Sequence, residues 1–159
     1  MNNCTKSAQV AELLRQQGLS LSAAESCTGG LFSATMVDTP GASSVFWGGV
    51  VSYVNEIKEH VLAVPHELIE EYTAVSAPVA RAMAQGVCRL TRSDIGISVT
   101  GLAGPDGGTP EIPVGRVYIA LCRVTKELFV REFDFSGTRE EIRRHAVDSM
   151  MDILIEILS

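Results

Sequence analysis

The chain contains 159 residues, 46% of them hydrophobic and 20% charged, a composition typical of a folded globular protein and not of a disordered chain. Thirteen basic and nineteen acidic residues give a net charge of −6. The basic surface that nucleic-acid backbones require is missing, so we expect no nucleic-acid partner. No apolar run approaches the roughly 18 to 20 residues that cross a bilayer, so we also expect no membrane partner. We predict a single domain over residues 1–159.

The cysteines indicate a reducing environment. The four are far apart and form no C-x-x-C pair; they are Cys4, Cys27, Cys88 and Cys122. The sequence starts without the apolar segment of a secretory signal. We therefore expect reduced thiols and a cytoplasmic location.

The N-terminal part of the sequence alternates predicted helices and strands. Helices are predicted where apolar residues recur every three or four positions, and strands where β-branched, aromatic and small residues alternate. These elements are a helix over 6–17, a strand over 19–24, a helix over 28–37, a strand over 45–53, and a helix over 56–63 with Asn55 as its N-cap.

The C-terminal part continues the alternation and ends with a hairpin and a helix. Its elements are a short helix over 65–72, a long helix over 76–92 capped by Ser76, a strand over 94–100, strands over 116–124 and 127–135 joined by a turn near 125–126, and a helix over 138–158 with a Thr138–Glu141 capping box. A loop rich in glycine and proline fills 101–115. Interleaved strands and helices predict a three-layer α/β fold, and the hairpin predicts a mixed sheet.

Three predicted loops are candidates for a binding site. Ligands of α/β proteins collect at the carboxyl ends of strands, where loops meet helix N-termini; the loops there are 25–30, 53–55 and 100–115. In the first, Ser26 leaves a strand and faces the free N–H groups of the next helix, which could form an oxyanion site. Ser26 and Thr28 are also good helix caps, and local sequence alone favours that simpler role.

Ser26 and Cys27 compete as candidate nucleophiles. A reactive thiol needs a neighbouring cation or histidine, and no histidine lies near Cys27 in the sequence. We therefore interpret Cys27 as a small buried residue. The histidines, His60, His66 and His145, stand beside charged residues in predicted helices, and none has metal-ligand spacing with another. We expect them to be solvated and predict no metal site.

Lysine is the remaining candidate base. Lys58 lies one turn into a predicted helix, on the same face as Asn55, and Tyr53 precedes it at a strand end. A buried amine loses its proton more easily, and Tyr53 could relay a proton between Lys58 and Ser26, in a serine–lysine variant of the catalytic triad. An arbitrary lysine is usually an exposed helix charge, and these residues alone leave that alternative open.

Several blocks of the sequence together resemble the CinA C-terminal domain family. The blocks are Ala24–Leu31, Ser52–Lys58, Val75–Ser76, Thr100–Thr109 and Pro113–Gly115. The resemblance runs from about residue 6 to about residue 157 and implies a three-layer α/β/α sandwich with a mixed sheet of about five strands. Enzymatic members of this family are nicotinamide mononucleotide amidohydrolases. The resemblance therefore implies a stand-alone amidohydrolase of pyridine nucleotide salvage, which forms nicotinic acid mononucleotide and ammonia through an acyl-enzyme.

The resemblance also implies roles for individual residues. Ser26 is the expected nucleophile, Lys58 its general base and Tyr53 the proton-relay partner. Backbone N–H groups of the glycine-rich loop can bind the phosphate, and Arg139 and Arg143 rank below the loop because surface arginines are usually solvated. The predicted substrate-binding residues are Thr28, Gly29, Gly30, Asn55, Thr100, Gly101, Gly104 and Arg139. No metal or other cofactor is implied, and a homo-oligomer is expected.

Two alternatives to this hydrolase stay open. The first is a non-catalytic nucleotide-binding or regulatory module, related to competence-damage inducible proteins, that keeps the glycine loops but has lost turnover. The second is a cysteine hydrolase using Cys27, which alkylation would inhibit and Ser26→Ala would leave active.

Overall fold

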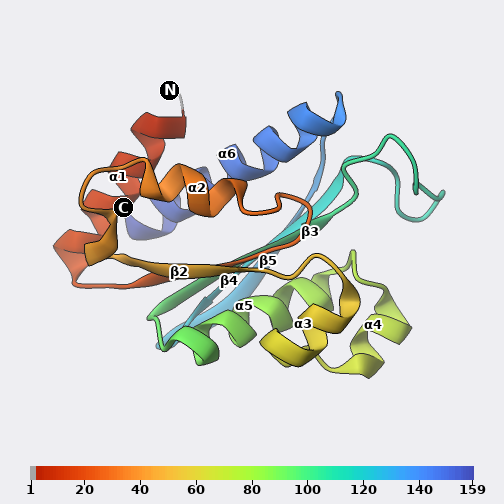
Figure 1. The fold of residues 1–159 in the computed structure, drawn as a ribbon, viewed down its shortest axis with the longest axis horizontal. Coiled ribbons are helices and arrows are strands. Elements are labelled where there is room, and N and C mark those ends of the chain that lie inside the picture. The colour runs from red at the N-terminus through yellow and green to blue at the C-terminus, as the bar shows by residue number, and fades with distance from the viewer. Residues whose placement is uncertain (1–2) are drawn as a thin grey trace.

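The computed structural model of the protein describes residues 3–159, which form a five-stranded sheet with helices on both faces (Figure 1). The strands are β1 (Leu21–Glu25), β2 (Phe46–Val51), β3 (Ile95–Gly101), β4 (Arg116–Arg123) and β5 (Lys126–Asp134). The helices are α1 (Asn3–Gln17), α2 (Leu31–Val37), α3 (Asn55–Leu62), α4 (His66–Tyr72), α5 (Ala77–Thr91) and α6 (Arg139–Leu158), and a short 3₁₀ helix, η1, spans Ala42–Ser44. Cys27, Cys88 and Cys122 are free thiols; the side chain of Cys4 lies outside the described part.

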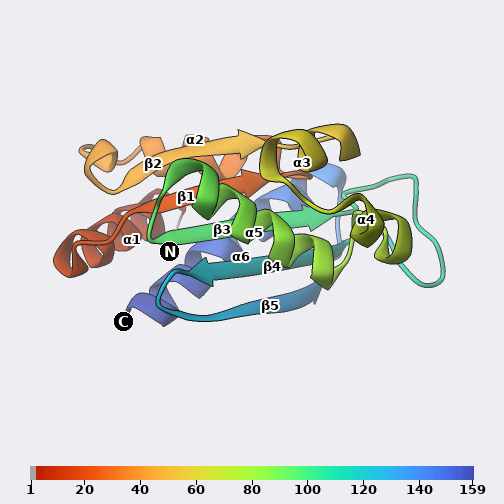
Figure 2. The same ribbon diagram turned by 90° about the horizontal axis from the view of Figure 1, so that it is seen from below.

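The sheet has the order β2-β1-β3-β4-β5 (Figure 2). β1 pairs in parallel with β2 and with β3, whereas β4 pairs antiparallel with β3 and β5. The β4–β5 pair is the predicted hairpin, with its turn at 124–125, one residue earlier than expected. The predicted mixed sheet of about five strands is confirmed.

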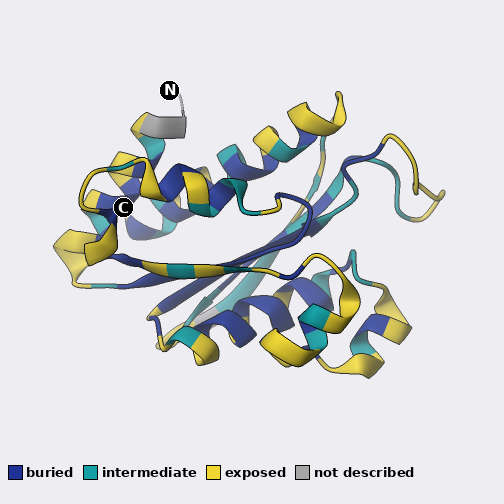
Figure 3. Ribbon diagram, viewed as in Figure 1, coloured by how far each residue is buried: buried dark blue, intermediate teal, exposed yellow. Residues whose placement is uncertain are grey.

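Helices cover both faces of the sheet, which confirms the predicted three-layer sandwich. α1, α2 and α6 lie on one face and α3, α4 and α5 on the other (Figure 1). Burial follows these layers, because the strands are mostly buried and the outer helix faces are exposed (Figure 3). The larger core cluster includes Val10, Phe32 and Met150, and a second cluster packs Met83 of α5 with Leu62 of α3. Within residues 3–159, no helix is long and apolar enough to cross a membrane.

Two helix starts agree with the sequence because a side chain caps each of them. Ser76 Oγ accepts a hydrogen bond from the Val79 N–H at the start of α5. Thr138 and Glu141 form the predicted capping box at the start of α6. These signals lie within one helical turn of sequence, so they can be read without the fold.

Some predicted helix starts are wrong. α1 begins at Asn3, three residues before the predicted start at residue 6. α2 begins at Leu31 and not at Thr28, because Gly30 adopts φ +99° and continues a turn instead of a helix. α3 begins at Asn55 itself, so Val54 occupies the N-cap position and no side chain caps the helix. Asn55 is therefore the first helical residue and not the cap.

The parallel strands bring the candidate loops together. β1, β2 and β3 point the same way, so their carboxyl ends meet at one edge of the sheet (Figure 2). The turn before α2, the connection to α3 and the loop over 102–115 all leave the sheet at that edge. The fold therefore assembles a site from segments that are far apart in the sequence.

Candidate active site

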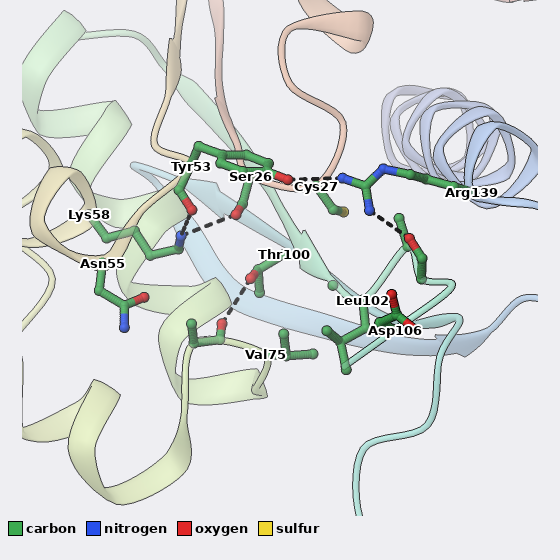
Figure 4. Close-up of a pocket in the computed structure, with 14 residues that line it drawn as sticks. Ser26, Cys27, Tyr53, Asn55, Lys58, Val75, Thr100, Leu102, Asp106 and Arg139 are labelled. Carbon is green, nitrogen blue, oxygen red and sulfur yellow. Dashed lines mark hydrogen bonds between the residues drawn. The ribbon is translucent and has the colours of Figure 1, made fainter. Parts of the chain in front are cut away.

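A pocket of about 270 Å³ lies at this edge of the sheet (Figure 4). Eight of the eleven predicted site residues line it: Ser26, Tyr53, Asn55, Lys58, Thr100, Gly101, Gly104 and Arg139. The other residues that line it are Cys27, Ala74, Val75, Leu102, Ala103 and Asp106. The three predicted loops thus converge, and the segment before α5 completes the wall.

Ser26 directly follows β1. Its backbone N–H donates to Val99 O of β3 at 3.0 Å, so the β1–β3 ladder extends to Ser26 and fixes where the turn begins. The side chain is 8% exposed, and its hydroxyl faces Lys58 (Figure 4). A substrate therefore reaches this hydroxyl through the pocket.

Lys58 of α3 is only 1% exposed. Its Nζ lies 3.1 Å from Ser26 Oγ, 2.7 Å from Ser52 O and 3.2 Å from Tyr53 O. A neutral amine has two N–H donors and one lone pair. The three oxygens can accept from the three N–H groups of an ammonium. When the amine is neutral, the two carbonyls still accept from its N–H groups and the Ser26 hydroxyl can donate to its lone pair, so the same partners also accommodate an uncharged amine.

The electrostatic surroundings of Lys58 favour the same form. Among residues 3–159, no carboxylate makes an ion pair with its amine. Burial lowers the pKa of Lys58 from 10.5 to about 8, because removal from water penalises the ammonium. About a tenth of the amine is then neutral at pH 7. This group can act as a general base without help from a histidine.

Glu25 is a site residue that the sequence reasoning missed. It immediately precedes Ser26, its side chain is fully buried, and its carboxylate accepts hydrogen bonds of 2.6 to 3.1 Å. The donors are Thr28 Oγ1, Gly30 N, Phe32 N, Ser33 N and Ser33 Oγ. These neutral donors stabilise the buried carboxylate, and no ion pair joins Glu25 to Lys58 among the described residues. The sequence signal is an acidic residue directly before a turn of small residues.

Thr28, Gly29 and Gly30 do not line the pocket, although the sequence predicts them as substrate-binding residues. The Gly29 N–H donates to Ser26 O at 3.0 Å and the Gly30 N–H donates to Glu25 at 3.1 Å. The free helix N–H groups expected in front of Ser26 are therefore already in use. The acceptor of the Gly30 N–H is the buried carboxylate of Glu25.

The phenol of Tyr53 is hydrogen-bonded to Arg139 and not to Lys58 or Ser26, so the proton relay stays a prediction. Its oxygen accepts a hydrogen bond from Arg139 Nη2 at 2.9 Å, and the side chain is 56% exposed. Tyr53 contacts the amine through its backbone carbonyl instead. Lys58 reaches the serine hydroxyl directly, so a proton can pass between them without a relay group.

Arg139 connects two walls of the pocket. It is the first residue of α6, and it donates from Nη1 to Gly104 O at 2.7 Å and from Nη2 to the phenol of Tyr53 (Figure 4). Arg139 is exposed, yet these two hydrogen bonds fix its side chain at the pocket that it was predicted to line. A guanidinium has five N–H donors, so several remain for an anionic group in the pocket.

Thr100 and Gly101 shape the wall through the backbone. The Thr100 hydroxyl donates to Ala74 O at 2.8 Å and ties β3 to the segment before α5. Gly101 lies so close to β4 that a Cβ would approach Arg116 O within 2.8 Å. Both positions are explained by chain packing, whatever ligand the pocket holds.

Asp106 and Val75 line the pocket and were not predicted as site residues. Asp106 could have been found as the acidic residue between Thr100 and Thr109 in a loop already singled out. Val75 gives no chemical signal in the sequence, because only the packing of α5 against the sheet brings it to the pocket.

The other candidate groups are Cys27, which lines the pocket, and three histidines that do not. Cys27 is 6% exposed, and burial raises the pKa of its thiol to about 12. The predicted burial of Cys27 is confirmed, and the raised pKa of its thiol disfavours a cysteine hydrolase. His60, His66 and His145 are exposed, as predicted, and the described residues contain no cluster of three or more metal-ligating side chains.

The fold and the pocket define a class of protein: a three-layer α/β protein with a buried serine–lysine pair at the carboxyl edge of a mixed sheet. The CinA C-terminal domain model matches residues 3–158, and the chain belongs to this family. The resemblance drawn from the sequence blocks is thereby confirmed.

Relatives named after CinA or competence damage share much of this sequence. The protein is 50% identical over 145 residues to a CinA-like protein of Dictyoglomus thermophilum, and 46% identical over 150 residues to a putative competence-damage inducible protein of Desulforudis audaxviator. These matches cover 91% and 94% of this chain but 35% and 36% of the relatives. The chain therefore spans about a third of their length.

Solved structures share the fold over nearly the full chain. A CinA superfamily protein of Klebsiella pneumoniae has a TM-score of 0.95 at 32% identity, and the match covers 99% of this chain and 98% of that one. A competence or damage-inducible protein of Enterobacter asburiae has a TM-score of 0.96 at 31% identity, with 100% and 99% covered.

Proposed function

We propose that the protein is an amidohydrolase that converts nicotinamide mononucleotide and water into nicotinic acid mononucleotide and ammonia. The observation that carries the reaction type is the 3.1 Å contact between Lys58 Nζ and Ser26 Oγ. The buried amine has a pKa lowered to about 8, so it can accept the serine proton near neutral pH. The choice of substrate rests on the family to which the chain belongs.

Acylation begins with proton transfer to Lys58. The neutral amine accepts the hydroxyl proton as Ser26 Oγ attacks the carboxamide carbon. The ammonium that forms donates to the carbonyls of Ser52 and Tyr53, which hold it against the serine. Lys58 then gives the proton to the leaving nitrogen. The C–N bond breaks, ammonia departs, and an acyl ester remains on Ser26.

The tetrahedral intermediate needs a donor for its oxyanion. The N–H groups at the start of α2 are bound to Glu25, so they are not available. We assign this role to the backbone N–H of Cys27, which has no hydrogen-bond partner in another residue of the 3–159 range. The residue after a serine nucleophile has the same part in α/β-hydrolases.

Deacylation uses the same base. Lys58 accepts a proton from water as the water oxygen attacks the acyl carbon, and it returns a proton to Ser26 Oγ as the ester bond breaks. The product leaves as the carboxylic acid and gives its proton to solvent, and the neutral amine is restored. Each cycle consumes one water and releases one ammonia.

The phosphate of the substrate has donors at the other side of the pocket. Arg139 supplies a positive charge there. The backbone N–H groups of Ala103 and Gly104 have no hydrogen-bond partners among the described residues, and they belong to the loop that Arg139 contacts. Together these groups can neutralise an anion although the whole chain carries a net charge of −6.

The direct test is ammonia release from nicotinamide mononucleotide by the wild type, Ser26→Ala and Ser43→Ala. Ser43 is exposed in η1 and lies outside the pocket, so it is the matched control. We expect Ser26→Ala to lower kcat about 10⁴-fold or more, and Ser43→Ala to match the wild type. Wild-type turnover in Ser26→Ala would contradict the proposal. Binding of the nucleotide without ammonia release by the wild type would instead support a non-catalytic nucleotide-binding module.

A further inference from the structure

The turn that carries Ser26 is held from two sides by opposite charges. On one side, Arg143 of α6 donates from Nε to Cys27 O at 3.0 Å and from Nη2 to Thr28 O at 2.9 Å. These contacts join residues 116 and 115 positions apart. The guanidinium also lies against Gly29, where a Cβ would approach Nη2 within 3.5 Å. Arg143 is therefore not the simply solvated side chain that the sequence suggested.

On the other side, the carboxylate of Glu25 accepts hydrogen bonds from N–H groups of the same segment. Its two carboxylate oxygens accept from Gly30 N, Phe32 N and Ser33 N, and from the hydroxyls of Thr28 and Ser33. The carbonyls of the turn thus accept hydrogen bonds from the guanidinium of Arg143, and its N–H groups donate to the carboxylate of Glu25. Each ionic group makes charge-assisted hydrogen bonds, which are stronger than neutral ones.

We propose that Arg143 and Glu25 are positioning residues that fix the orientation of Ser26 toward Lys58. This inference rests on the proposed function, because it assigns the two residues to the nucleophile of that reaction. Neither side chain touches the Ser26 hydroxyl. Both act through hydrogen bonds to the backbone of the residues that follow Ser26.

The conformation of the turn explains why such a clamp is needed. Gly29 and Gly30 have φ of +58° and +99°, so the segment contains two consecutive residues with wide conformational freedom. The ladder bond from the Ser26 N–H to Val99 O fixes the start of the turn, and the side chains of Glu25 and Arg143 restrict the glycine-containing segment that follows the serine. A displacement of about 1 Å at a reacting atom can cost about 100-fold in rate.

The test compares Arg143→Met with Arg144→Met. Arg144 is the next residue of α6, is exposed, and pairs with Glu140 at 2.8 Å, so it controls for the loss of one cation from this helix. The readouts are kcat and KM for nicotinamide mononucleotide, the melting temperature, and the rate of covalent labelling of Ser26 by a fluorophosphonate. In the labelling reaction, an Oγ–P bond forms, the P–F bond breaks, and Lys58 takes up the hydroxyl proton as fluoride leaves.

We expect Arg143→Met to lower kcat and the labelling rate together, by about 10- to 100-fold, with KM changed less than about threefold. Millimolar guanidinium should restore part of the labelling rate in Arg143→Met, and it should have no such effect on Arg144→Met. A purely structural role would instead lower the melting temperature and the fraction of active protein without rescue. Equal labelling rates in the two variants would overturn the inference.

Glu25→Gln gives an independent measurement. The amide places an N–H donor where a carboxylate oxygen now accepts, so we expect slower labelling in the folded fraction, with Glu25→Asp intermediate between Glu25→Gln and the wild type. If the wild type is not labelled at Ser26, both this inference and the proposed function are overturned. If it is labelled but releases no ammonia from nicotinamide mononucleotide, the substrate assignment fails, and the labelling rates still decide the role of Arg143.

Discussion

Lys58 Nζ and Ser26 Oγ lie 3.1 Å apart, and both side chains are buried although 32 positions separate them in the chain. The contact forms because β1 and β2 are parallel neighbours, so that Ser26 and the start of α3 leave the sheet side by side. A lysine in this place has carbonyls and a hydroxyl as its neighbours and no carboxylate partner in the described chain. This arrangement gives the amine the properties of a base.

The rate of the reaction should depend on pH through Lys58. The base must be neutral, and its pKa is lowered to about 8, so kcat/KM should rise about tenfold per pH unit below 8 and level off above it. A pH–rate profile from pH 6 to 10 measures this rise in kcat/KM. Lys58→Met should lower kcat about 10²- to 10⁴-fold and should abolish the rise below pH 8. If the profile of that variant still bent at the same pH, the titrating group would be another residue.

Protein stability should also depend on pH through Lys58. The pKa of this lysine is about 8 in the fold and about 10.5 when unfolded, so between these values the unfolded chain binds more protons. Folding stability should therefore rise with pH over that interval, by roughly 3 kcal/mol relative to Lys58→Met. Urea unfolding of both proteins from pH 7 to 11 measures the difference. The exposed Lys126 provides a control, because Lys126→Met should show no such trend.

Tyr53→Phe distinguishes the observed geometry from a proton relay. The substitution removes the hydroxyl that Arg139 contacts but keeps the backbone carbonyl that Lys58 contacts. We expect KM to rise a few-fold and kcat to stay within about threefold of the wild type, because a partly exposed hydrogen bond contributes only about 1 kcal/mol. A 100-fold loss of kcat with unchanged KM would instead support proton transfer through the Tyr53 phenol.

Cys27 should resist alkylation. Its thiol is buried, and its pKa is raised to about 12, so hardly any thiolate is present at pH 7.5. We expect iodoacetamide to leave Cys27 unmodified in the folded protein, as read by peptide mass spectrometry, and to leave activity intact. Rapid modification of Cys27 with parallel loss of activity, and full activity in Ser26→Ala, would favour the cysteine hydrolase.

The sequence predicts the fold well because most of its signals are local. The caps at Ser76 and Thr138 and the alternation in β3 lie within a few residues. Ser26 and Lys58 could be paired because parallel strands place successive loops at one edge. Glu25 and Arg143 could not be assigned, since their roles depend on hydrogen bonds to a turn whose shape follows from the folded chain.

Other expectations are not tested by the fold. The homo-oligomer, the nucleotide partner, the cytoplasmic location and the single-domain extent stay predictions. The exposed side chains of Trp47 and Val51 on the edge strand β2 are consistent with a self-association surface. Their burial would depend on a second chain, and a single sequence cannot specify that contact.

The protonation state of the Lys58 amine is the most direct test of its role as a base. In protein labelled with ¹³C and ¹⁵N at lysine, the Lys58 side-chain resonances, assigned by their absence in Lys58→Met, can be followed by NMR from pH 6 to 11 without any substrate. The account predicts a midpoint near 8, which is the pKa that burial gives this group. A midpoint above 10, typical of a solvated lysine, would contradict it.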